Sequence, residues 1–547
     1  MPIWKLKYDT IVNSHELALK QLLKNRGVGS IEELEKYNDL NDAHLKEYFG
    51  ADFVTSIEKS VKLIKSYIKK DLPIVIHGDY DADGVTSTAL IWQAIYEKLG
   101  YKNVFPYIPS RFDEGYGLSF DSLKNIDEKY FKEKKGLLIT VDCGITATDQ
   151  IEQAKKNGIQ VLLTDHHQKS KKIPNPDLLV WTDKLCGVGI AYFIVNRLVK
   201  NNDFGLDLVA IGTIADIQPL TNINRSLVKK GLNQINTNPR IGIKKLLNIA
   251  GFEKEVKAKD IGWVLAPRIN ASGRLENAFD ALRLLCTKDV QVAEKLSLSL
   301  DLINKERQQK TELMVKTAEL QVTNELVSFI VGENFHEGIV GLIAGRLTQK
   351  YYKPAIVLQV ENNIAKGSAR SIPEIDIIKL LRKFEGEFIN LGGHSAAAGF
   401  SVSYEKVEKL KIYINDYLKE INNGILYKRN LEIEFEIDLA IFNEKLFNLT
   451  QMLEPCGVSN PTPLFLIKNL RIVDFKKIGR DFSHISFNLT NGKDFIKGVG
   501  FGMAQLSDSL NYDDNVDIVC SLTQNIWNGN TNYEFQLKDL KKSSSQS

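Results

Sequence analysis

The chain has 547 residues, of which 43% are apolar and 25% charged, a composition typical of a folded protein of several domains rather than a disordered or collagen-like one. Lys and Arg number 71 against 68 Asp and Glu, so the net charge of +3 does not by itself predict nucleic-acid binding, although a local basic groove remains possible. No apolar run reaches the ~18 residues that cross a bilayer, and the first ten residues lack the core of a signal peptide. The five cysteines are scattered and form no CxxC pair, which argues against disulfides. We therefore expect a protein of the reducing cytosol.

Short apolar runs alternate with helical stretches from about residue 72 to residue 219. The runs cover residues 74–76, 137–141, 161–163 and 178–180. Nearly continuous apolar strands between helices predict a parallel sheet that is covered on both faces, which is an α/β fold. The first three runs end in polar segments, at residues 77–84, 142–144 and 165–167. Because doubly wound sheets open a crevice at the carboxyl ends of their strands, we expect these three segments to meet.

A long helix and a second α/β unit follow. Residues 289–331 contain neither Gly nor Pro, which predicts a helix of roughly 35 residues, about 50 Å long at 1.5 Å per residue. Such a helix suits a strut between two domains, although two helices joined by a tight turn would also fit. In the second unit we expect strands at 329–331 and 355–358 and a helix at 339–350.

Short alternating runs broken by Asn, Gly and Asp follow residue 424 and predict a small antiparallel barrel. Between residues 465 and 500, seven Lys and Arg stand against three Asp, as expected for a groove that binds single strands but equally for a solvated outer face. The expected divisions are an N-terminal extension (1–45), a first α/β domain (46–235), a helical connector (236–325), a second α/β domain (326–423), a β-barrel domain (424–540) and a disordered tail (541–547).

Histidine and aspartate gather at the predicted strand ends. Asp81 and Asp83 follow the first strand, Asp142 the next and His166 the third. Mixed carboxylate and imidazole ligands suit Mn²⁺ or Mg²⁺ better than structural zinc, and Asp142, leaving a middle strand, is the candidate to bridge two such ions. A single Asp after a strand is more often a helix cap or turn former. Three strand ends that all carry these residue types favour a metal site.

These segments resemble motifs of the DHH phosphoesterase superfamily. The first three motifs match residues 77–84 (HGDYDADG), 141–144 (VDCG) and 164–167 (TDHH), and the fourth matches Asp216 in GTIADIQP. Other segments resemble the RecJ single-strand exonuclease branch of that superfamily: 265–274 (LAPRINASGR), 366–371 (KGSARS), 392–400 (GGHSAAAGF), 453–461 (LEPCGVSNP) and 527–529 (WNG). The motifs occur in the expected order from about residue 45 to residue 540.

The resemblance implies a site with two divalent cations, Mn²⁺ or Mg²⁺. One would be held by His77, Asp81 and Asp142, and the other by Asp83, Asp142, His166 and Asp216. Asp79 and His167 would lie in the same site and position water or the scissile phosphate.

Arginines beside small residues are candidates to bind phosphate, because a guanidinium grips a phosphate with two parallel hydrogen bonds. On local sequence alone, surface salt bridges would be the more common role. The resemblance favours Arg274, Ser368 and Arg370 as phosphate contacts, with Arg111 the weakest candidate, and places His394 in a glycine-rich loop near the substrate.

The family implies a 5′→3′ exonuclease of single-stranded DNA that acts in DNA repair and recombination. It also implies a RecQ-type helicase and a single-strand-binding protein as partners, although we find no docking motif for either. One alternative is a DHH phosphodiesterase of short oligonucleotides or cyclic dinucleotides, but such relatives generally lack a barrel. Another is a non-catalytic replication scaffold, but scaffolds lose metal ligands, and every acidic and imidazole position of the four motifs is filled here.

Overall fold

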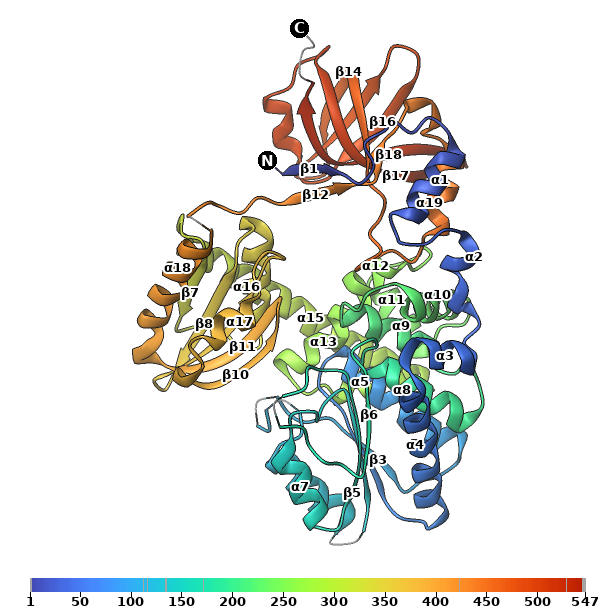
Figure 1. Cartoon of the computed structure of the whole chain (residues 1–547), viewed down its shortest axis with the longest axis vertical. Coiled ribbons are helices and arrows are strands. Elements are labelled where there is room, and N and C mark those ends of the chain that lie inside the picture. Colours follow the sequence, from blue (N-terminus) through green and yellow to red (C-terminus); the bar gives the residue numbers. More distant parts are fainter. Residues whose placement is uncertain are drawn as a thin grey trace. The chain divides into compact units, whose positions relative to one another are not determined.

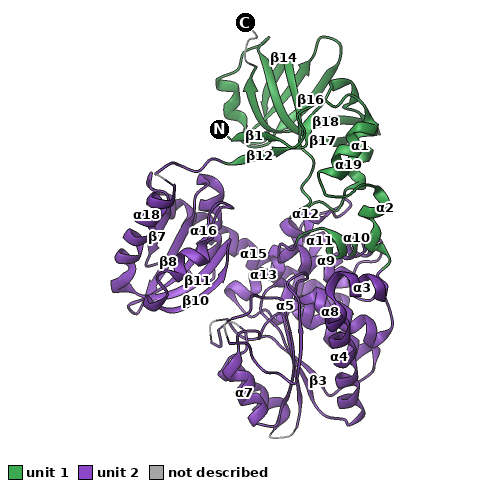
Figure 2. Ribbon diagram, viewed as in Figure 1, with its two compact units in different colours: residues 1–39, 219–226, 429–547 green, residues 40–218, 227–428 purple. Residues whose placement is uncertain are grey.

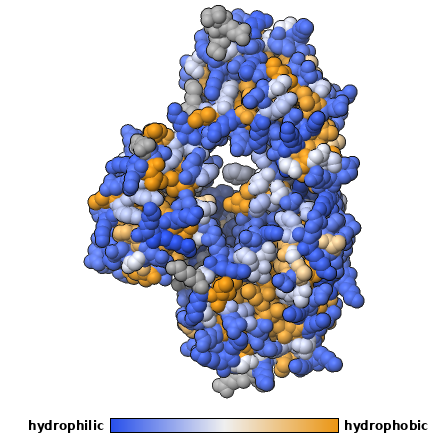
Figure 3. All heavy atoms as spheres, viewed as in Figure 1, coloured by the Kyte–Doolittle hydropathy of each residue, from blue (hydrophilic) through white to orange (hydrophobic). Residues whose placement is uncertain are grey.

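The computed structural model describes residues 2–111, 113–115, 117–132, 135–170, 172–422, 424–527 and 529–543 (Figure 1). The chain divides into two compact units (Figure 2). Unit 1 contains residues 1–39, 219–226 and 429–547, and unit 2 contains residues 40–218 and 227–428. Hydrophilic residues cover most of the face drawn in Figure 3. Among the described residues, no helix combines the length and the apolar character that a membrane span requires.

Unit 2 begins with the predicted parallel sheet. Its strands, in spatial order, are β3 (Val104–Tyr107), β2 (Ile74–His77), β4 (Leu137–Val141), β5 (Gln160–Asp165) and β6 (Leu178–Trp181), and all neighbours are parallel. The three middle strands are almost wholly buried, which explains their continuous apolar sequence. The predicted fold class and strand positions are confirmed.

Helices cover both faces of this sheet (Figure 1). One face packs against α6 (Phe120–Ile126) and α7 (Thr148–Lys156), whose apolar residues share a core with β2, β4 and β5. The other helices of this domain are α3 (Asp42–Phe49), α4 (Ala51–Lys69), α5 (Ala82–Gln93), α8 (Gly187–Val199) and α9 (Leu206–Ala215). Of these, α5 packs on α8 and α9.

The connector is helical. Helix α10 (Asn222–Thr237) leads into it, and the connector contains α11 (Ile241–Ile249), α12 (Ala258–Asp260), α13 (Ala266–Leu275), α14 (Phe279–Cys286) and α15 (Val290–Glu319). The helix α15 runs unbroken for 30 residues, so the single-helix prediction is confirmed, and Asp289 caps its first turn by accepting hydrogen bonds from two backbone N–H groups.

The second α/β domain is built on a mixed sheet. Its strands, in spatial order, are β10 (Phe388–His394), β11 (Ala397–Ser403), β9 (Ile364–Arg370), β8 (Ala355–Glu361) and β7 (Ser328–Gly332). Only β7 and β8 are parallel. Helix α16 (Val340–Tyr351) shares one core with β7 and β8, while α17 (Ile377–Arg382) and α18 (Val407–Asn422) share another with β9, β10 and β11.

Unit 1 contains the predicted barrel. Strands β14 (Phe465–Ile478), β15 (His484–Thr490), β16 (Phe495–Gly500), β18 (Asn530–Lys542) and β17 (Asn515–Trp527) pair in that order, and β17 pairs back with β14 to close the barrel. β18 extends two residues into the segment expected to be disordered, and residues 544–547 of that segment lie outside the described residues.

Residues 1–39, expected to belong to a separate extension, form part of unit 1. Strand β1 (Ile3–Leu6) pairs in parallel with β12 (Asn430–Ile433). The unit also contains α1 (His15–Lys24), α2 (Ile31–Leu34), β13 (Phe435–Glu436) and α19 (Glu444–Met452). Val12 and Leu22 are fully buried in the same apolar core as the barrel strands. Arg225, also fully buried, donates hydrogen bonds to Glu35 and to the carbonyls of Met452 and Glu454, which ties residues 219–226 into this unit.

Candidate active site

Three strand ends of the parallel sheet carry the polar side chains of the site. His77 is the last residue of β2, Asp142 follows β4 directly and Asp165 is the last residue of β5. Asp142 has a positive φ of 61°, an uncommon conformation for a residue other than glycine and one often found at functional sites. The backbone thus turns sharply at the point where the strand enters the site.

The first turn of α8 holds Asp83 in place. The backbone N–H groups of Gly187 and Val188 donate hydrogen bonds of 2.6 and 2.8 Å to the two Asp83 oxygens. Gly187 has no space for a side chain, because a Cβ there would lie 2.5 Å from the Cβ of Asp142. Glycine is therefore required where this helix approaches both carboxylates.

His166 is surrounded by three carboxylates. Its Nε2 lies 3.0 Å from an Asp142 oxygen, 3.8 Å from an Asp83 oxygen and 3.7 Å from an Asp216 oxygen. Burial and the nearby charge of His167 lower the pKa of His166 to about 3, so its imidazole is neutral and suited to binding a metal. The structure thus brings together all four residues expected around one cation.

A second cluster joins Asp79, Asp81 and Asp142, each of which has an oxygen within 4.8 Å of the others. Asp81 also caps α5, since its Oδ1 accepts hydrogen bonds from the N–H groups of Asp83 and Gly84. The capping role and the proposed ligand role are therefore compatible. This cluster includes Asp79, which we had expected only to position water or phosphate, and it does not include His77.

His77 lies at the edge of the site and is fully buried. Its Nδ1 lies 3.5 Å from the Cys143 sulfur, and its Nε2 has no hydrogen-bond partner among the described residues. Burial lowers the pKa of His77 to about 4, so the ring is neutral. A buried imidazole nitrogen without a partner is costly unless a ligand supplies one.

The carboxylates cannot all be ionised without added positive charge. Burial and the charges of neighbouring carboxylates raise the pKa of Asp83 to about 6 and that of Asp216 to about 8. The same two causes raise the pKa of Asp79 and Asp142 well above the ordinary value. In addition, Oδ1 of Asp79 is buried without a hydrogen-bond partner among the described residues. This donor set fits divalent cations.

The pKa of His167 shifts in the opposite direction from that of His166. Burial alone would lower the pKa of His167, but the hydrogen bond to Asp165 and the charges of Asp165, Asp216 and Asp79 raise it to about 9. Its Nδ1 lies 2.8 Å from Asp165, and its carbonyl accepts a hydrogen bond from the Trp181 indole. Below about pH 9 the metal-free protein therefore holds a charged imidazolium beside the carboxylates.

Two residues of the site were not singled out in the sequence. Asp165 organises the histidine pair, because it accepts hydrogen bonds from the backbone N–H groups of His166 and His167 and from that of Ile145. Its place at a strand end, just before the histidines, was a usable signal. Gln218 donates a 2.7 Å hydrogen bond to Asp216; it lies in the fourth motif, but we expected no role for it from the sequence.

Three arginines form a positive cluster in unit 2. Burial and the neighbouring charges of Arg111 and Arg370 contribute to lowering the pKa of Arg274 to about 10, and Arg111 likewise lowers the pKa of Arg370. Across the described parts of the chain, none of the three forms an ion pair with a carboxylate. The surface salt-bridge alternative is therefore not supported, and a cluster of unpaired guanidinium groups suits a phosphate. Ser368 lies in this cluster, because its hydroxyl accepts a hydrogen bond from Arg370.

His394 was expected in a loop, and that expectation is wrong. It is the last residue of β10, paired with Ala397 at the start of β11 in a tight hairpin. Gly393 makes the hairpin possible, because its φ is 144° and a Cβ there would lie 2.3 Å from the Ala397 carbonyl oxygen. The His394 ring nevertheless reaches the metal-ligand candidates, since it stacks on His167 with ring centres 5.9 Å apart.

Comparisons with known proteins match this architecture domain by domain. Residues 73–213 match the DHH family N-terminal domain, residues 323–420 the DHHA1 domain and residues 433–539 the RecJ OB domain. The chain is 33% identical over 540 residues to the single-stranded-DNA-specific exonuclease RecJ of Bacillus subtilis, a match that covers 95% of this chain and 67% of that protein. The chain belongs to the RecJ family.

Solved structures agree with this assignment. The crystal structure of Thermus thermophilus RecJ in complex with Mn²⁺ matches with a TM-score of 0.82 and 27% identity, covering 99% of this chain and 80% of that one. The structure of the same protein in complex with Mg²⁺ matches with a TM-score of 0.72 and 25% identity, covering 99% and 79%. The predicted family and the order of its domains are thus confirmed.

Proposed function

We propose that this chain is a metal-dependent exonuclease that hydrolyses phosphodiester bonds of single-stranded DNA in the 5′→3′ direction, in DNA repair and recombination. The observation that carries the proposal is the position of His166, whose Nε2 lies within 3.8 Å of three carboxylates in the unit that also holds unpaired arginines. The RecJ relatives, named as single-stranded-DNA-specific exonucleases, support the substrate. The polarity follows from the family resemblance.

The residues fit two divalent cations, Mn²⁺ or Mg²⁺, and both ions are found in the related crystal structures. We assign one cation to Asp81 and Asp142, with Asp79 or His77 completing its ligands, and the other to Asp83, Asp142, His166 and Asp216. When bound, two such ions neutralise charge on the attacking and leaving oxygens of the phosphodiester.

The protein's own groups complete the proposed chemistry. The guanidinium groups of Arg111, Arg274 and Arg370 would hold a terminal phosphate, which fixes the position of the first phosphodiester relative to the carboxylates. His167 would contact a phosphate oxygen, and its 2.8 Å hydrogen bond to Asp165 favours the protonated ring that can donate to that oxygen. His394 stacks on His167 and limits its movement.

Two alternatives are less well supported. A phosphodiesterase of short oligonucleotides or cyclic dinucleotides would not need the closed barrel that matches the RecJ OB domain. A non-catalytic scaffold would not need a cluster in which carboxylates are crowded enough to raise the pKa of Asp216 to about 8.

The decisive experiment compares Asp142→Ala with Cys143→Ser. Asp142 belongs to both clusters, so its loss should abolish hydrolysis of an end-labelled single strand while the circular dichroism spectrum stays unchanged. The neighbouring Cys143→Ser variant should keep most of its activity, because we assign the thiol no chemical role. Wild-type turnover of Asp142→Ala in saturating Mn²⁺ would refute the metal assignment.

A second experiment varies the ends of the DNA substrate and tests both the phosphate contacts and the direction of hydrolysis. Single strands labelled at either end and 5′-tailed or blunt duplexes should show release of nucleotides from the 5′ end of unpaired strands. Unpairing terminal bases costs a few kcal/mol, so blunt duplexes should be cut far more slowly. Arg370→Lys should lose the preference for a 5′-phosphate despite its equal charge, because lysine cannot form the bidentate contact. Arg382→Lys, on α17, is the matched control.

A further inference from the structure

A hollow of about 450 Å³ has no part in the proposed reaction, and it is lined by residues of the first α/β domain together with Asn277 and Phe279 of the connector. Ser110, which lines it, directly precedes Arg111, and Asn277, which also lines it, follows Arg274 by three residues. Two of the chain segments that carry the phosphate-binding candidates therefore border the hollow. Its volume lies within the range of small-molecule sites.

Aromatic rings form part of its wall. Tyr107 and Tyr130 meet edge to face with ring centres 6.5 Å apart. Each is fixed by further packing, since Tyr107 stacks on His77 and Tyr130 stacks on Phe105. Phe279, at the start of α14, adds a ring that is 38% exposed. Rings held in place with accessible surface suit a planar aromatic ligand.

The polar groups of the hollow offer both a donor and an acceptor. The Asn277 side chain accepts a hydrogen bond from the Phe279 backbone through Oδ1, and in the described structure its Nδ2 has no partner. The edge strand β3 supplies the acceptor. Asn103 and Tyr107 direct their carbonyls toward β2, so the carbonyl of Pro106 faces outward, where no strand pairs with it.

Two further features narrow the choice of ligand. Pro106 has no N–H group, so another β-strand cannot add regularly at this edge, and a peptide is disfavoured. Lys129, which lines the hollow and lies over the Tyr130 ring at 5.1 Å, has no ion-pair partner within the described ranges. Asp113 and Glu114 also line the hollow, so carboxylates in the same lining offset the charge of Lys129. The lining therefore favours an uncharged heterocycle rather than a phosphate.

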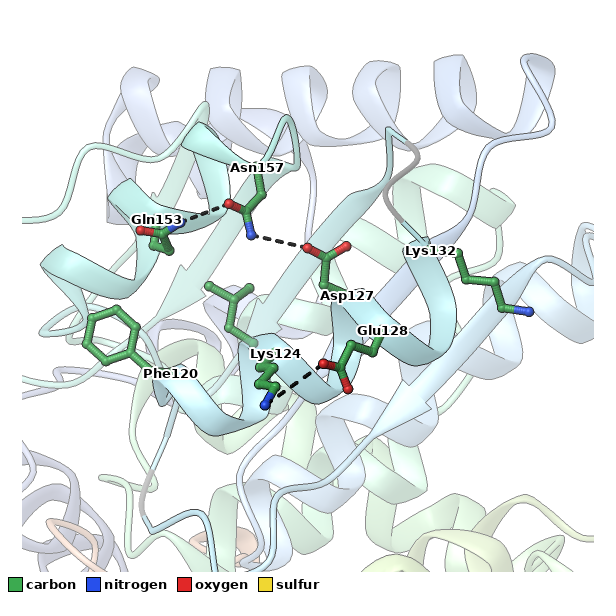
Figure 4. Close-up of a pocket in the computed structure, with 8 residues that line it drawn as sticks. Phe120, Lys124, Asp127, Glu128, Lys132, Gln153 and Asn157 are labelled. Atoms are coloured by element: carbon green, nitrogen blue, oxygen red, sulfur yellow. Dashed lines mark hydrogen bonds and ion pairs between the residues drawn. The ribbon is translucent and has the colours of Figure 1, made fainter.

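A neighbouring hollow of about 490 Å³ offers a contrast (Figure 4). Its polar side chains bond one another, since Gln153 donates to Asn157 at 2.8 Å and Asn157 donates to Asp127 at 3.1 Å. Phe120 is the one aromatic ring among its described lining residues. Polar side chains of the first hollow also bond one another, since Asn125 donates to Glu114 at 2.7 Å. The two hollows therefore differ mainly in their aromatic rings, and the second provides a control.

We propose that the hollow beside Arg111 and Arg274 binds the nucleobase of a nucleotide. The rings contact the face of the base, and Asn277 and the Pro106 carbonyl bond its polar edge. The nucleobase comes either from the bound strand or from a released mononucleotide. The identification of the source as a bound strand or a released mononucleotide rests on the function proposed above. The binding of a base does not, because it needs no hydrolysis.

The test is binding of deoxyadenosine to the full-length protein in EDTA, measured by calorimetry. A nucleoside carries no phosphate, so the arginine cluster does not contribute. Phe279→Ala should raise the Kd about 10-fold, as expected for the loss of one stacking contact, and Asn277→Ala should raise it several-fold. Phe120→Ala, which removes an exposed ring from the hollow in Figure 4, should leave the Kd unchanged.

Melting temperatures confirm that each variant is folded. Absence of wild-type binding at millimolar deoxyadenosine, or wild-type Kd values in both Phe279→Ala and Asn277→Ala, would overturn the proposal. Because EDTA prevents metal-dependent hydrolysis, a failure here is independent of a failure of the proposed nuclease activity.

A second set of ligands identifies the source of the base. In EDTA, 5′-phosphorylated 12-mers with one abasic site at the first, second or third position are bound to wild type and to Phe279→Ala. If the base belongs to the strand, one abasic position weakens binding to wild type and has no effect in Phe279→Ala. If the base belongs to a free mononucleotide, the three abasic positions weaken strand binding equally, and they do so to the same extent in wild type and in Phe279→Ala. Deoxyadenosine then still binds to the complex of the protein with the strand.

Discussion

Gly187→Ala should damage the active site although it replaces no residue that could bind a metal. An added Cβ would lie 2.5 Å from the Asp142 Cβ and 2.9 Å from its Cγ. Reaching an ordinary carbon–carbon distance of ~3.5 Å requires a shift of about 1 Å. The helix α8 cannot easily retreat, because the Gly187 N–H donates a 2.6 Å hydrogen bond to Asp83. The shift therefore falls on Asp142, which serves both clusters.

The expected loss follows from that displacement. A misplacement of about 1 Å at a reacting centre costs roughly 100-fold in rate, and overpacking of a buried position costs about 1–3 kcal/mol of stability. We expect kcat/KM on a 5′-phosphorylated single strand to fall by about that factor, with weaker Mn²⁺ binding by calorimetry and a lower Tm.

The control is Gly345→Ala on α16, where an added Cβ meets nothing within 4 Å. Alanine is favoured over glycine in helix interiors by roughly 0.5–1 kcal/mol, so this variant should keep its activity and match or exceed the wild-type Tm. If Gly187→Ala retains wild-type activity and Mn²⁺ affinity, the inference that this close approach positions Asp142 is wrong.

Three further outcomes are expected. In the metal-free protein the pKa of Asp216 (about 8) and that of Asp83 (about 6) lie above the unfolded value near 4, so their contribution to stability is lost as the pH rises toward 8. Mn²⁺ takes the place of these protons, so it should raise Tm more at pH 8 than at pH 5.5, and an equal rise at both would contradict the assignment. Gln218→Ala should weaken Mn²⁺ binding on the order of 10-fold in calorimetry, whereas Gln153→Ala on α7 should not. Deleting residues 429–547 should weaken binding to a 40-mer more than to a 10-mer in fluorescence anisotropy. The deletion also uncovers the apolar face of α1, so the protein should aggregate in light scattering. Removing residues 1–39 as well takes that face away and should reduce the aggregation.

The sequence predicted the parts of the fold that depend on local pattern. Buried parallel strands are apolar throughout, so their ends, and with them Asp142 and His166, could be located directly. The hairpin at His394 was missed because Gly392 and Gly393 disfavour strands, and pairing with β11 overrides that preference. The pairing of Ile3 with Asn430 joins distant segments, and no local pattern can reveal it.

The side chains that support the metal ligands were equally hidden. Gln218 lies two residues beyond Asp216, and only the bend of the chain after α9 directs its amide to that carboxylate. Unpaired arginines also look like paired ones in a sequence, and only the contacts in the fold show that Arg274 forms no ion pair with a carboxylate of the described residues.

The composition of unit 1 has a consequence for synthesis on the ribosome. Its core joins Val12 and Leu22 to barrel strands that begin after residue 429, so the amino-terminal segment emerges about 390 residues before its partners. At 5–20 residues per second, that segment waits on the order of 20 to 80 s with apolar side chains uncovered. Unit 2, apart from its junctions with residues 219–226, has all of its sequence available earlier. Unit 2 should therefore fold before unit 1, although unit 1 contains the first residues to be synthesised. A chaperone would bind most readily to the amino-terminal segment while it waits.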